Sequence, residues 1–396
     1  MDYTKGVATE KAAPAFKVGG RIEPPYFVDR EEELSQLVHD ARTLSQSNVV
    51  IAPRRFGKTA LLRAVEAQVS REMLAAYVSC LGMLGAVDFH DRLVEAVLSA
   101  FAAKHGKARR LLATWRDVLR KPVVGMREIL EEIGGSIEGV GSIRLKFRTR
   151  EVDEPALLAA ALDFPERLAE EGGERILVIL DEFQALAGFN GHLFSLFKER
   201  MESQRRVVYL FSGSSLGLLT EVFGREGKSP LYQMVGRLFL GEIPEPHVHR
   251  YYRERLRDVH RVDISESALN RVTGYVGGIP YYFQKLGLGL ERDIALKGLS
   301  RIDAPHVDTA FERLLEELSA DFQERWQTRF SEQQRAILKV LARSPGTVSE
   351  VAKELGVPAP NLTYGLSRLA EAMILTKEGR TYRITDRVFA AWLRAL

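Results

Sequence analysis

A short segment between an apolar run and an amphipathic stretch constrains the fold of this chain more than any other feature. It reads Ile51-Ala52-Pro53-Arg54-Arg55-Phe56-Gly57-Lys58-Thr59, and its first two residues end the apolar run 49–52. A buried strand, a loop ending in Gly-Lys-Thr and a helix are typical of a phosphate-binding loop. In such a loop, backbone N–H groups and the helix N-terminus face phosphate oxygens. The pattern predicts a strand at 48–52 and a helix from Gly57 to about Ser70.

The residue types of this loop suit phosphate chemistry. Gly57 allows close approach of the backbone, Lys58 is expected to reach the β- and γ-phosphates, and the Thr59 hydroxyl to coordinate Mg²⁺. Ala52 stands where such loops usually have glycine, which adds a Cβ but removes no ligand. Arg54 and Arg55 either help to bind phosphate or face solvent. The predicted nucleotide-binding residues here are Ala52, Pro53, Arg54, Arg55, Phe56, Gly57, Lys58, Thr59 and Ala60.

A second motif supplies carboxylates. The apolar residues 176–180 predict a buried strand, and Asp181 and Glu182 follow it directly. Asp181 is expected to bind Mg²⁺ together with Thr59, and Glu182 to act as the general base for the attacking water. The alternative is a strand that ends in a solvated acidic pair. Because a phosphate-binding loop precedes this strand, we favour catalysis, with Lys58 and Glu182 as catalytic residues.

Two further features would complete such a site. The strand Val207–Phe211 ends in Ser212-Gly213-Ser214-Ser215, and ligands of open α/β sheets bind at the carboxyl ends of strands. If this strand lies between the other two, Ser212 or Ser214 would contact the γ-phosphate or the water; otherwise the serines form a polar turn. Arg237 is either a catalytic arginine finger or an ordinary surface arginine.

Composition excludes several classes of protein. The 396 residues are 45% hydrophobic and 28% charged, as in ordinary globular proteins, and the net charge of +3 argues neither for nucleic acid nor for a membrane. The one cysteine, Cys80, excludes an intrachain disulfide and suits a reducing, cytoplasmic setting. The clean apolar runs are too short to span a bilayer, and the first residues have no apolar signal core, so we expect no membrane association.

Six spaced motifs together resemble the archaeal-type ATPase family, in the STAND branch of AAA+-like P-loop ATPases. They are 27–34, 53–59, 180–184, 213–215, 229–237 and 277–282. The resemblance implies ATP and Mg²⁺ as cofactors. It also implies that Phe27, Val28 and Arg30 lie by the adenine, and that Gly278 and Pro280 contact the nucleotide from a helical lid. Without that resemblance, Gly277-Gly278 before a new helix predicts a loop, and loops of this kind are more often structural. Asp29 stands where the family commonly has glycine.

Strands alternating with helices predict an α/β fold with a parallel sheet between helices. We expect a flexible leader at 1–20 and a P-loop ATPase core at 21–243, with a helical and hairpin insertion at about 104–150. A helical lid at 244–325 and a winged helix-turn-helix at 326–396 follow. The segment 101–150 has twelve Lys and Arg against five Asp and Glu, which indicates a nucleic-acid face or a solvated helix surface.

The C-terminal pattern predicts three helices and a β-hairpin. Thr347 and Glu350 form a capping-box sequence, and the turn 377–380 joins two short strands. The exposed face of the third helix is predicted to hold Asn361, Thr363, Tyr364, Ser367 and Arg368. One cation on that face is few for a DNA reader. The candidate DNA contacts are Arg368, Lys377, Arg380 and Arg383; the alternative is that this module contacts protein.

The sequence therefore predicts a Mg²⁺-dependent ATPase whose nucleotide state moves the lid and the winged helix, with duplex DNA as one target. The alternative is a slow, nucleotide-gated regulatory or DNA-binding switch whose winged helix contacts protein. The expected partners are ATP and ADP, then duplex DNA, a protein partner or a second copy of the chain. A purely structural adaptor is disfavoured because Lys58, Thr59 and both carboxylates are present.

Overall fold

The computed structural model describes residues 13–20, 22–23, 25–105, 154–188, 192–214, 222–223, 229 and 231–396. These residues group into two compact units. The sheet unit comprises Arg30–Ala52 and Lys58–Leu240, and the C-terminal unit comprises Met1–Asp29, Pro53–Gly57 and Gly241–Leu396. The predicted insertion and the basic segment lie outside the described residues from residue 106 onward.

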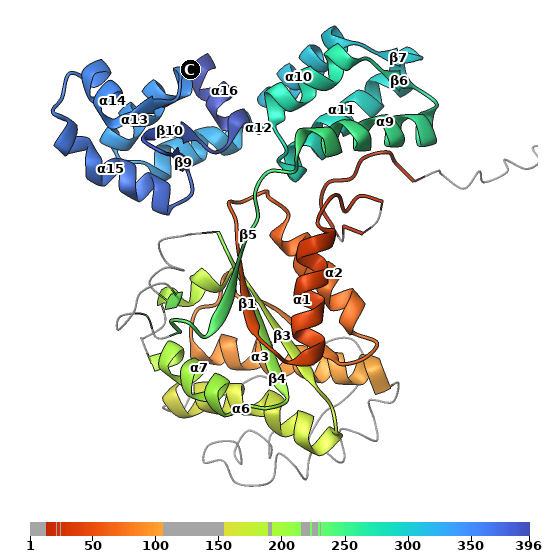
Figure 1. Ribbon diagram of the computed structural model, residues 1–396, viewed down its shortest axis with the longest axis vertical. Helices are drawn as coiled ribbons and strands as arrows, with labels where there is room; N and C mark the ends of the chain where they lie inside the picture. Colours follow the sequence, from red (N-terminus) through yellow and green to blue (C-terminus); the bar gives the residue numbers. More distant parts are fainter. Residues whose placement is uncertain are drawn as a thin grey trace, which may run out of the picture. The chain divides into compact units, whose positions relative to one another are not determined.

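Five parallel strands form the sheet, in the order β2-β3-β4-β1-β5 (Figure 1). They are β1 (Ser47–Ile51), β2 (Leu74–Ser79), β3 (Ile176–Asp181), β4 (Val207–Gly213) and β5 (Val235–Phe239). β3 is buried along its whole length and β1 along all but its first residue. Such continuously apolar strands are typical of a parallel sheet with both faces covered. The predicted α/β class is confirmed.

The strand β4 lies between β1 and β3, as the site prediction requires. Val50 pairs with Ser212 across β1 and β4, and Leu180 pairs with Phe211 across β3 and β4. All three strands run in the same direction, so their carboxyl ends meet at one edge of the sheet. The residues that follow β1, the carboxylates at the end of β3 and the serines at the end of β4 are thereby brought to the same edge.

Helices flank the sheet (Figure 1). They are α1 (Glu31–Thr43), α2 (Lys58–Val69), α3 (Ala86–His105), α6 (Glu154–Gly172) and α7 (His192–Ser203), with the 3-10 helix η1 (Phe183–Gly188). In α1 the N-cap is Arg30; the preceding Asp29 has a left-handed φ of 51°, and its carboxylate pairs with His247. Among the described residues, no helix is both long and apolar enough to cross a membrane.

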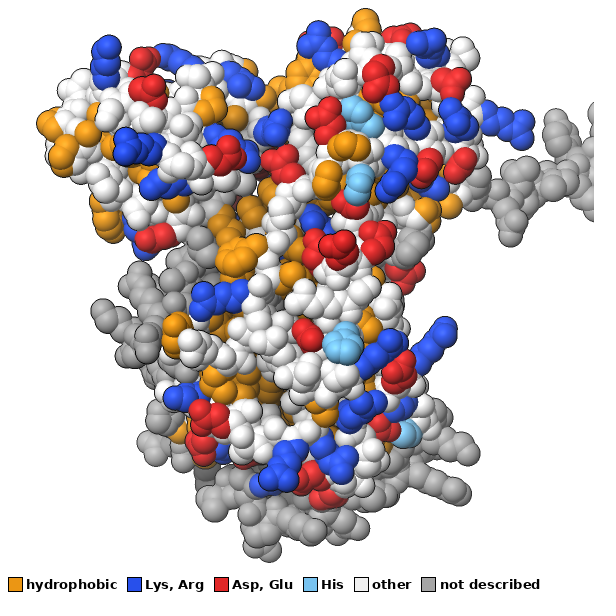
Figure 2. Space-filling model, viewed as in Figure 1, with side chains coloured by type: hydrophobic (Ala, Val, Ile, Leu, Met, Phe, Trp, Pro, Cys, Tyr) orange, Lys and Arg blue, Asp and Glu red, His pale blue; other side chains and the backbone are white. Residues whose placement is uncertain are grey.

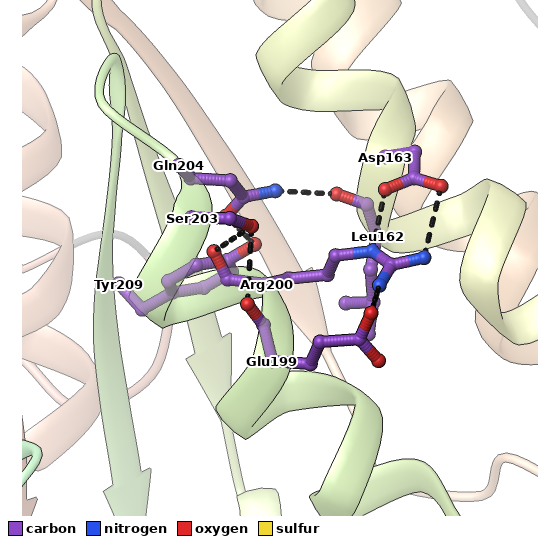
Figure 3. A network of polar contacts seen from close by, with 7 residues as sticks. All are labelled: Leu162, Asp163, Glu199, Arg200, Ser203, Gln204 and Tyr209. Atoms are coloured by element: carbon purple, nitrogen blue, oxygen red, sulfur yellow. Dashed lines mark hydrogen bonds and ion pairs between the residues drawn. The ribbon is translucent and has the colours of Figure 1, made fainter.

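A polar network ties the end of α7 to α6 and β4 (Figure 3). The Arg200 guanidinium lies 2.6 Å from Asp163 of α6, and this hydrogen bond raises the pKa of Arg200. Gln204 donates to the carbonyl of Leu162 at 2.7 Å and accepts from the Tyr209 hydroxyl at 2.8 Å. The network connects the helices α6 and α7 to the central strand β4, which carries Ser212.

The C-terminal unit is helical apart from short strands. Its first part contains α9 (Glu245–His260), α10 (Glu266–Val276), α11 (Pro280–Lys297) and α12 (Ala304–Arg329), with the two-residue strands β6 (Asp263–Ile264) and β7 (Arg301–Ile302). The last part contains α13 (Glu332–Arg343), β8 (Gly346–Thr347), α14 (Val348–Leu355), α15 (Ala359–Glu371), β9 (Leu375–Glu378), β10 (Thr381–Ile384) and α16 (Arg387–Ala395).

The three helices and the hairpin predicted for the C-terminal part are present. The Thr347 hydroxyl accepts from the backbone of Glu350, whose side chain reaches back to Thr347, which is the predicted capping box. Aromatic side chains join this part to α12: the rings of Phe322 and Phe389 are 5.3 Å apart, and Trp326 and Trp392 are 6.4 Å apart. The end of the chain is thereby packed onto the long helix α12.

Part of the predicted loose leader is packed. Of residues 1–20 the structure describes 13–20, and there Phe16 is fully buried, with its ring 4.8 Å from that of Tyr252. A Cβ on Gly287 of α11 would lie 2.3 Å from the Phe16 ring, so only glycine leaves room for it. The prediction of a flexible leader is therefore wrong for this stretch, because a buried aromatic ring holds it on α9 and α11.

Candidate active site

The loop between β1 and α2 is a turn whose two ends are joined by a hydrogen bond from Lys58 to the backbone of Ala52. Lys58 is buried, and its ammonium donates to the carbonyl of Ala52 at 2.9 Å. Gly57 has φ 88°, in the region that favours glycine, and Arg55 adopts φ 76° in spite of its side chain. Ala52 is not among the residues with positive φ, so its Cβ is accommodated without strain. The replacement of glycine at this position therefore leaves the turn intact.

The two sequence motifs meet at Asp181. This residue, the last of β3, is 3% exposed, and its Oδ2 accepts a hydrogen bond from Thr59 Oγ1 at 2.8 Å. A hydroxyl and a carboxylate in contact are hard oxygen ligands of the kind that Mg²⁺ prefers. Within the described part of the chain, no cluster of three His, Cys, Asp or Glu could hold a metal. The Thr59 hydroxyl and the Asp181 carboxylate fit two of the ligands of a hard cation, and their binding of Mg²⁺ stays a prediction.

Ser212 of β4 and Ser214, which follows this strand, support different carboxylates. Ser212 is fully buried and donates to Oδ1 of Asp181, which also accepts from the Glu182 backbone at 3.0 Å. Ser214 donates to Oε2 of Glu182 at 3.1 Å. The sequence did not distinguish Ser212 from Ser214; the structure gives each its own carboxylate. A contact of either hydroxyl with phosphate or water stays a prediction.

Glu182 is held in a defined position. Its backbone has φ 55°, an uncommon conformation for a residue with a side chain. Its Oε2 accepts hydrogen bonds from both Gln184 and Ser214, and the Gln184 amide also donates to Ser214 at 3.2 Å. The polar contacts of Gln184 follow from the turn after β3, and sequence reasoning assigned this residue no role.

Sequence reasoning also missed Tyr77. This residue of β2 donates its hydroxyl to Oδ2 of Asp181 at 2.5 Å, and burial raises the pKa of its phenol. Burial likewise raises the pKa of Cys80, which follows β2 directly, so its thiol stays protonated and unreactive. The reach of Tyr77 to the neighbouring strand gives no signal in the sequence.

Arg237 and Arg30 make contacts within the sheet unit. Arg237 is on the edge strand β5, is exposed, and donates to the carbonyl of Phe223. Its role as an arginine finger stays a prediction. Arg30 is 7% exposed and pairs with Glu33 at 2.9 Å. Phe27 and Val28 are half-buried and belong to the C-terminal unit, and their contact with adenine also stays a prediction.

Arg55 and Arg54 differ in their surroundings. The Arg55 guanidinium donates to the Tyr282 hydroxyl and lies 3.5 Å from Asp386, which caps α16. It also lies 5.1 Å from the ring of Tyr281. Arg54 is exposed. The solvated alternative does not describe Arg55, since its charge faces groups of the C-terminal unit, and a phosphate contact of this residue stays a prediction.

The glycine and proline of the predicted lid contact have structural surroundings. Gly278 accepts from the Ile243 backbone at 2.8 Å, and a Cβ on Gly278 would lie 1.8 Å from the Ile243 carbonyl oxygen. Pro280 begins α11, and its Cγ is 3.6 Å from the position of a Cβ on Gly57. Close backbone packing therefore requires glycine at 278, and a nucleotide contact of either residue stays a prediction.

The candidate DNA contacts are partly neutralised. Arg368 pairs with Glu371 at 2.9 Å, and Arg383 pairs with Glu378 at 2.8 Å, whereas Lys377 and Arg380 are exposed. On the face shown in Figure 2, acidic and basic side chains are interspersed over the C-terminal unit. The residues predicted on the outer face of the third helix are exposed on α15: Asn361, Thr363, Tyr364, Ser367 and Arg368.

Comparison with known proteins gives a matching family model and similar solved structures. A family model described as an ATPase domain predominantly from Archaea matches residues 27–286, and no curated protein matches the chain. The Walker-type ATPase Paby2304 of Pyrococcus abyssi is 19% identical over 96% of this chain and 99% of that one, with a TM-score of 0.67. The ORC2 protein of Aeropyrum pernix, solved in ADPNP–ADP complexes, is 15% identical over 97% and 98%, with a TM-score of 0.60. At these identities the likeness shows a shared fold.

Proposed function

This chain belongs to the family of ATPase domains found predominantly in Archaea, and we propose that it binds ATP with Mg²⁺ and hydrolyses it. The observation that carries the proposal is the 2.8 Å hydrogen bond between Thr59 and Asp181, which joins the phosphate loop to the acidic strand end. That ORC2 was solved with ADPNP and ADP supports a nucleotide as the ligand of this fold.

Each residue of the candidate site has a separate role in hydrolysis. The N–H groups of the loop and of the first turn of α2 bind phosphate oxygens, and Lys58 adds a positive charge there. Thr59 and Asp181 hold Mg²⁺, which when bound neutralises charge that develops on the phosphate oxygens. Glu182 accepts a proton from the water whose oxygen attacks the γ-phosphorus, and the bond to the ADP oxygen breaks. Gln184 and Ser214 orient the Glu182 carboxylate.

We propose that the parts of the C-terminal unit move in response to the nucleotide that is bound. In this proposal α9–α12 form a helical lid, and α13–α16 with β8–β10 form a winged helix. Carboxylates nearly balance the charges of Arg368 and Arg383, which favours a second candidate function. In that function the protein is a regulatory switch that hydrolyses ATP slowly, and this module contacts another protein. Duplex DNA is the other target to test, through Lys377 and Arg380.

One assay tests the proposal and separates these functions. Steady-state phosphate release from ATP is measured with Mg²⁺, with a chelator in place of Mg²⁺, and with Mg²⁺ plus duplex DNA. We expect release that depends on Mg²⁺. Stimulation by DNA would favour a DNA-directed ATPase, and slow release without stimulation would favour the switch. Binding of ATP without any release above buffer would contradict hydrolysis, and absence of binding would contradict the whole assignment.

A further inference from the structure

We propose that Tyr77 is a positioning residue for the magnesium ligand Asp181, an inference that rests on the function proposed above. The Tyr77 hydroxyl donates to Oδ2 of Asp181 at 2.5 Å, and the same oxygen accepts from Thr59 at 2.8 Å. Among the side chains of the two motifs, the Tyr77 hydroxyl hydrogen-bonds this carboxylate oxygen. We therefore expect Tyr77 to affect the binding of the metal, and to affect the binding of the nucleotide only through the metal.

The register of the sheet explains how Tyr77 reaches the site. In the parallel pair of β2 and β3, Tyr77 lies opposite Ile179, and Ser79 lies opposite Asp181. Asp181 is thus the diagonal neighbour of Tyr77, two residues further along the partner strand. Diagonal neighbours on one face of a sheet are ~7–8 Å apart, a span that an aromatic side chain can bridge. A shorter side chain at position 77 would leave the carboxylate without this donor.

The ring of Tyr77 is held by α2, the helix that begins with the phosphate-loop lysine. The Arg63 guanidinium lies 3.2 Å from the centre of the Tyr77 ring, and Arg63 itself pairs with Glu66 at 2.8 Å. Thr59 and Arg63 are four residues apart, so they lie on the same face of α2. One face of α2 therefore carries Thr59, which donates to Asp181, and Arg63, which contacts the ring of the second donor, Tyr77.

The Asp181 carboxylate is fixed from both sides. Ser212 and the Glu182 backbone donate to Oδ1, and Tyr77 and Thr59 donate to Oδ2. A Thr59 hydroxyl that binds a metal with its oxygen keeps its proton and can still donate to Oδ2, so Tyr77 and Thr59 together orient this oxygen. Because groups that orient a metal ligand typically contribute about 10–100-fold to metal affinity, loss of the Tyr77 hydroxyl is expected to weaken Mg²⁺ binding about tenfold.

The test replaces Tyr77 by phenylalanine, which keeps the ring and its contact with Arg63. Binding of a fluorescent ATP analogue is titrated over a series of Mg²⁺ concentrations and in a chelator. We expect Tyr77→Phe to raise the Mg²⁺ concentration for half-maximal enhancement of binding about tenfold. Binding of the analogue in chelator is expected to stay within about twofold of the parent. A purely structural loss would weaken binding in chelator as well.

Matched variants make the result decisive. Tyr209→Phe removes a hydroxyl that donates to Gln204 and is expected to leave the Mg²⁺ dependence unchanged. If Tyr77→Phe fails to fold, Arg63→Gln, which removes the cation beside the ring, is expected to shift the Mg²⁺ dependence in the same direction. An unchanged Mg²⁺ dependence in the folded variant overturns the role of Tyr77. A parent protein that binds the analogue equally well with and without Mg²⁺ overturns the proposed function instead.

Discussion

The Thr59 hydroxyl lies 2.8 Å from the Asp181 carboxylate, although 122 residues separate them in the sequence. The contact exists because β1 and β3 run parallel on either side of β4 and end at the same edge of the sheet. A helix that starts at the end of β1 therefore places its first hydroxyl beside the last residue of β3. The predictions below begin from this edge.

Lys58 is expected to determine nucleotide binding. At a ligand concentration about 100 times Kd, ATP with Mg²⁺ should stabilise the folded protein by ~2.7 kcal/mol and raise its Tm accordingly. Lys58→Ala removes the charge directed at the phosphates and should abolish most of that rise. Lys198→Ala, an exposed lysine of α7, is the control and should keep the rise. The same rise in Lys58→Ala as in the parent would refute the assignment of the loop.

Glu182 is expected to act in catalysis and not in binding. Glu182→Gln keeps the shape of the side chain and the contacts to Gln184 and Ser214, but cannot accept a proton. Phosphate release should fall ~10²-fold or more, within the usual contribution of a general base, while binding of ATP is retained. Single-turnover hydrolysis and equilibrium binding measure the two effects separately. Normal turnover in this variant would show that another group activates the water.

Gly278 is expected to be intolerant of any side chain. A Cβ there would lie 1.8 Å from the Ile243 carbonyl oxygen, so Gly278→Ala should lower the free energy of unfolding by about 2 kcal/mol. Gly274, within α10, has no atom within 4 Å of its would-be Cβ. Gly274→Ala should therefore be neutral or stabilise by about 0.5–1 kcal/mol, because alanine favours helix. Equal Tm values for the two variants would contradict this reading of the packing.

Asp293 is expected to stabilise the C-terminal unit in a pH-dependent way. Arg313 donates to both of its carboxylate oxygens, at 2.9 and 2.5 Å, and lowers the pKa of Asp293. A carboxyl with a lowered folded-state pKa contributes stability above its unfolded pKa of ~3.9, and this contribution is lost as the pH falls through the folded pKa.

The measurement for Asp293 is denaturant unfolding between pH 7 and pH 3. Asp293→Asn should be less stable than the parent at pH 7, and the difference should shrink as the pH falls below about 4. Asp263→Asn, at an exposed residue that lies 3.5 Å from Arg257, is the control and should change stability little at any pH. A difference for Asp293→Asn that is independent of pH would argue against the ion pair.

The four candidate DNA contacts are expected to contribute unequally to the binding of duplex DNA. Lys377 and Arg380 have no carboxylate partner among the residues described, whereas Arg368 and Arg383 do. Two effective phosphate contacts predict a slope of log affinity against log salt of about −1.8, from ~0.9 per contact, instead of about −3.6 for four. Replacing Lys377 and Arg380 by alanine should remove most of this slope. Replacing Arg253 and Arg257 of α9 is the charge-matched control, and an equal effect of both pairs would exclude the wing.

The sequence was sufficient to predict the strands that contain a continuous apolar run, and it predicted other elements less well. β1, β3 and β4 are runs of Val, Ile, Leu and aromatic residues, and their ends carry recognisable motifs. β5 was missed because Gly236 and Arg237 interrupt its apolar pattern, which an edge strand tolerates. Gly236 itself faces Asn48, whose Oδ1 would lie 2.3 Å from a Cβ.

The supporting residues of the site depend on contacts that no local pattern contains. Tyr77 reaches Asp181 across a strand pair whose register is known only once the sheet is assembled. Phe16 is buried because Gly287 leaves a space on α11, and the two are far apart in the sequence. Local motifs therefore predicted the residues of the phosphate loop and the acidic strand end, and tertiary packing determined which side chains hold them in place.

The aromatic cluster between α12 and α16 makes the protein its own spectroscopic probe. The chain has three tryptophans, and two of them, Trp326 and Trp392, pack against each other and against Phe389. With Trp115 replaced by phenylalanine, all tryptophan emission would come from that cluster. A change in its wavelength on addition of nucleotide would then report on the surroundings of the final helix, without any label attached to the protein.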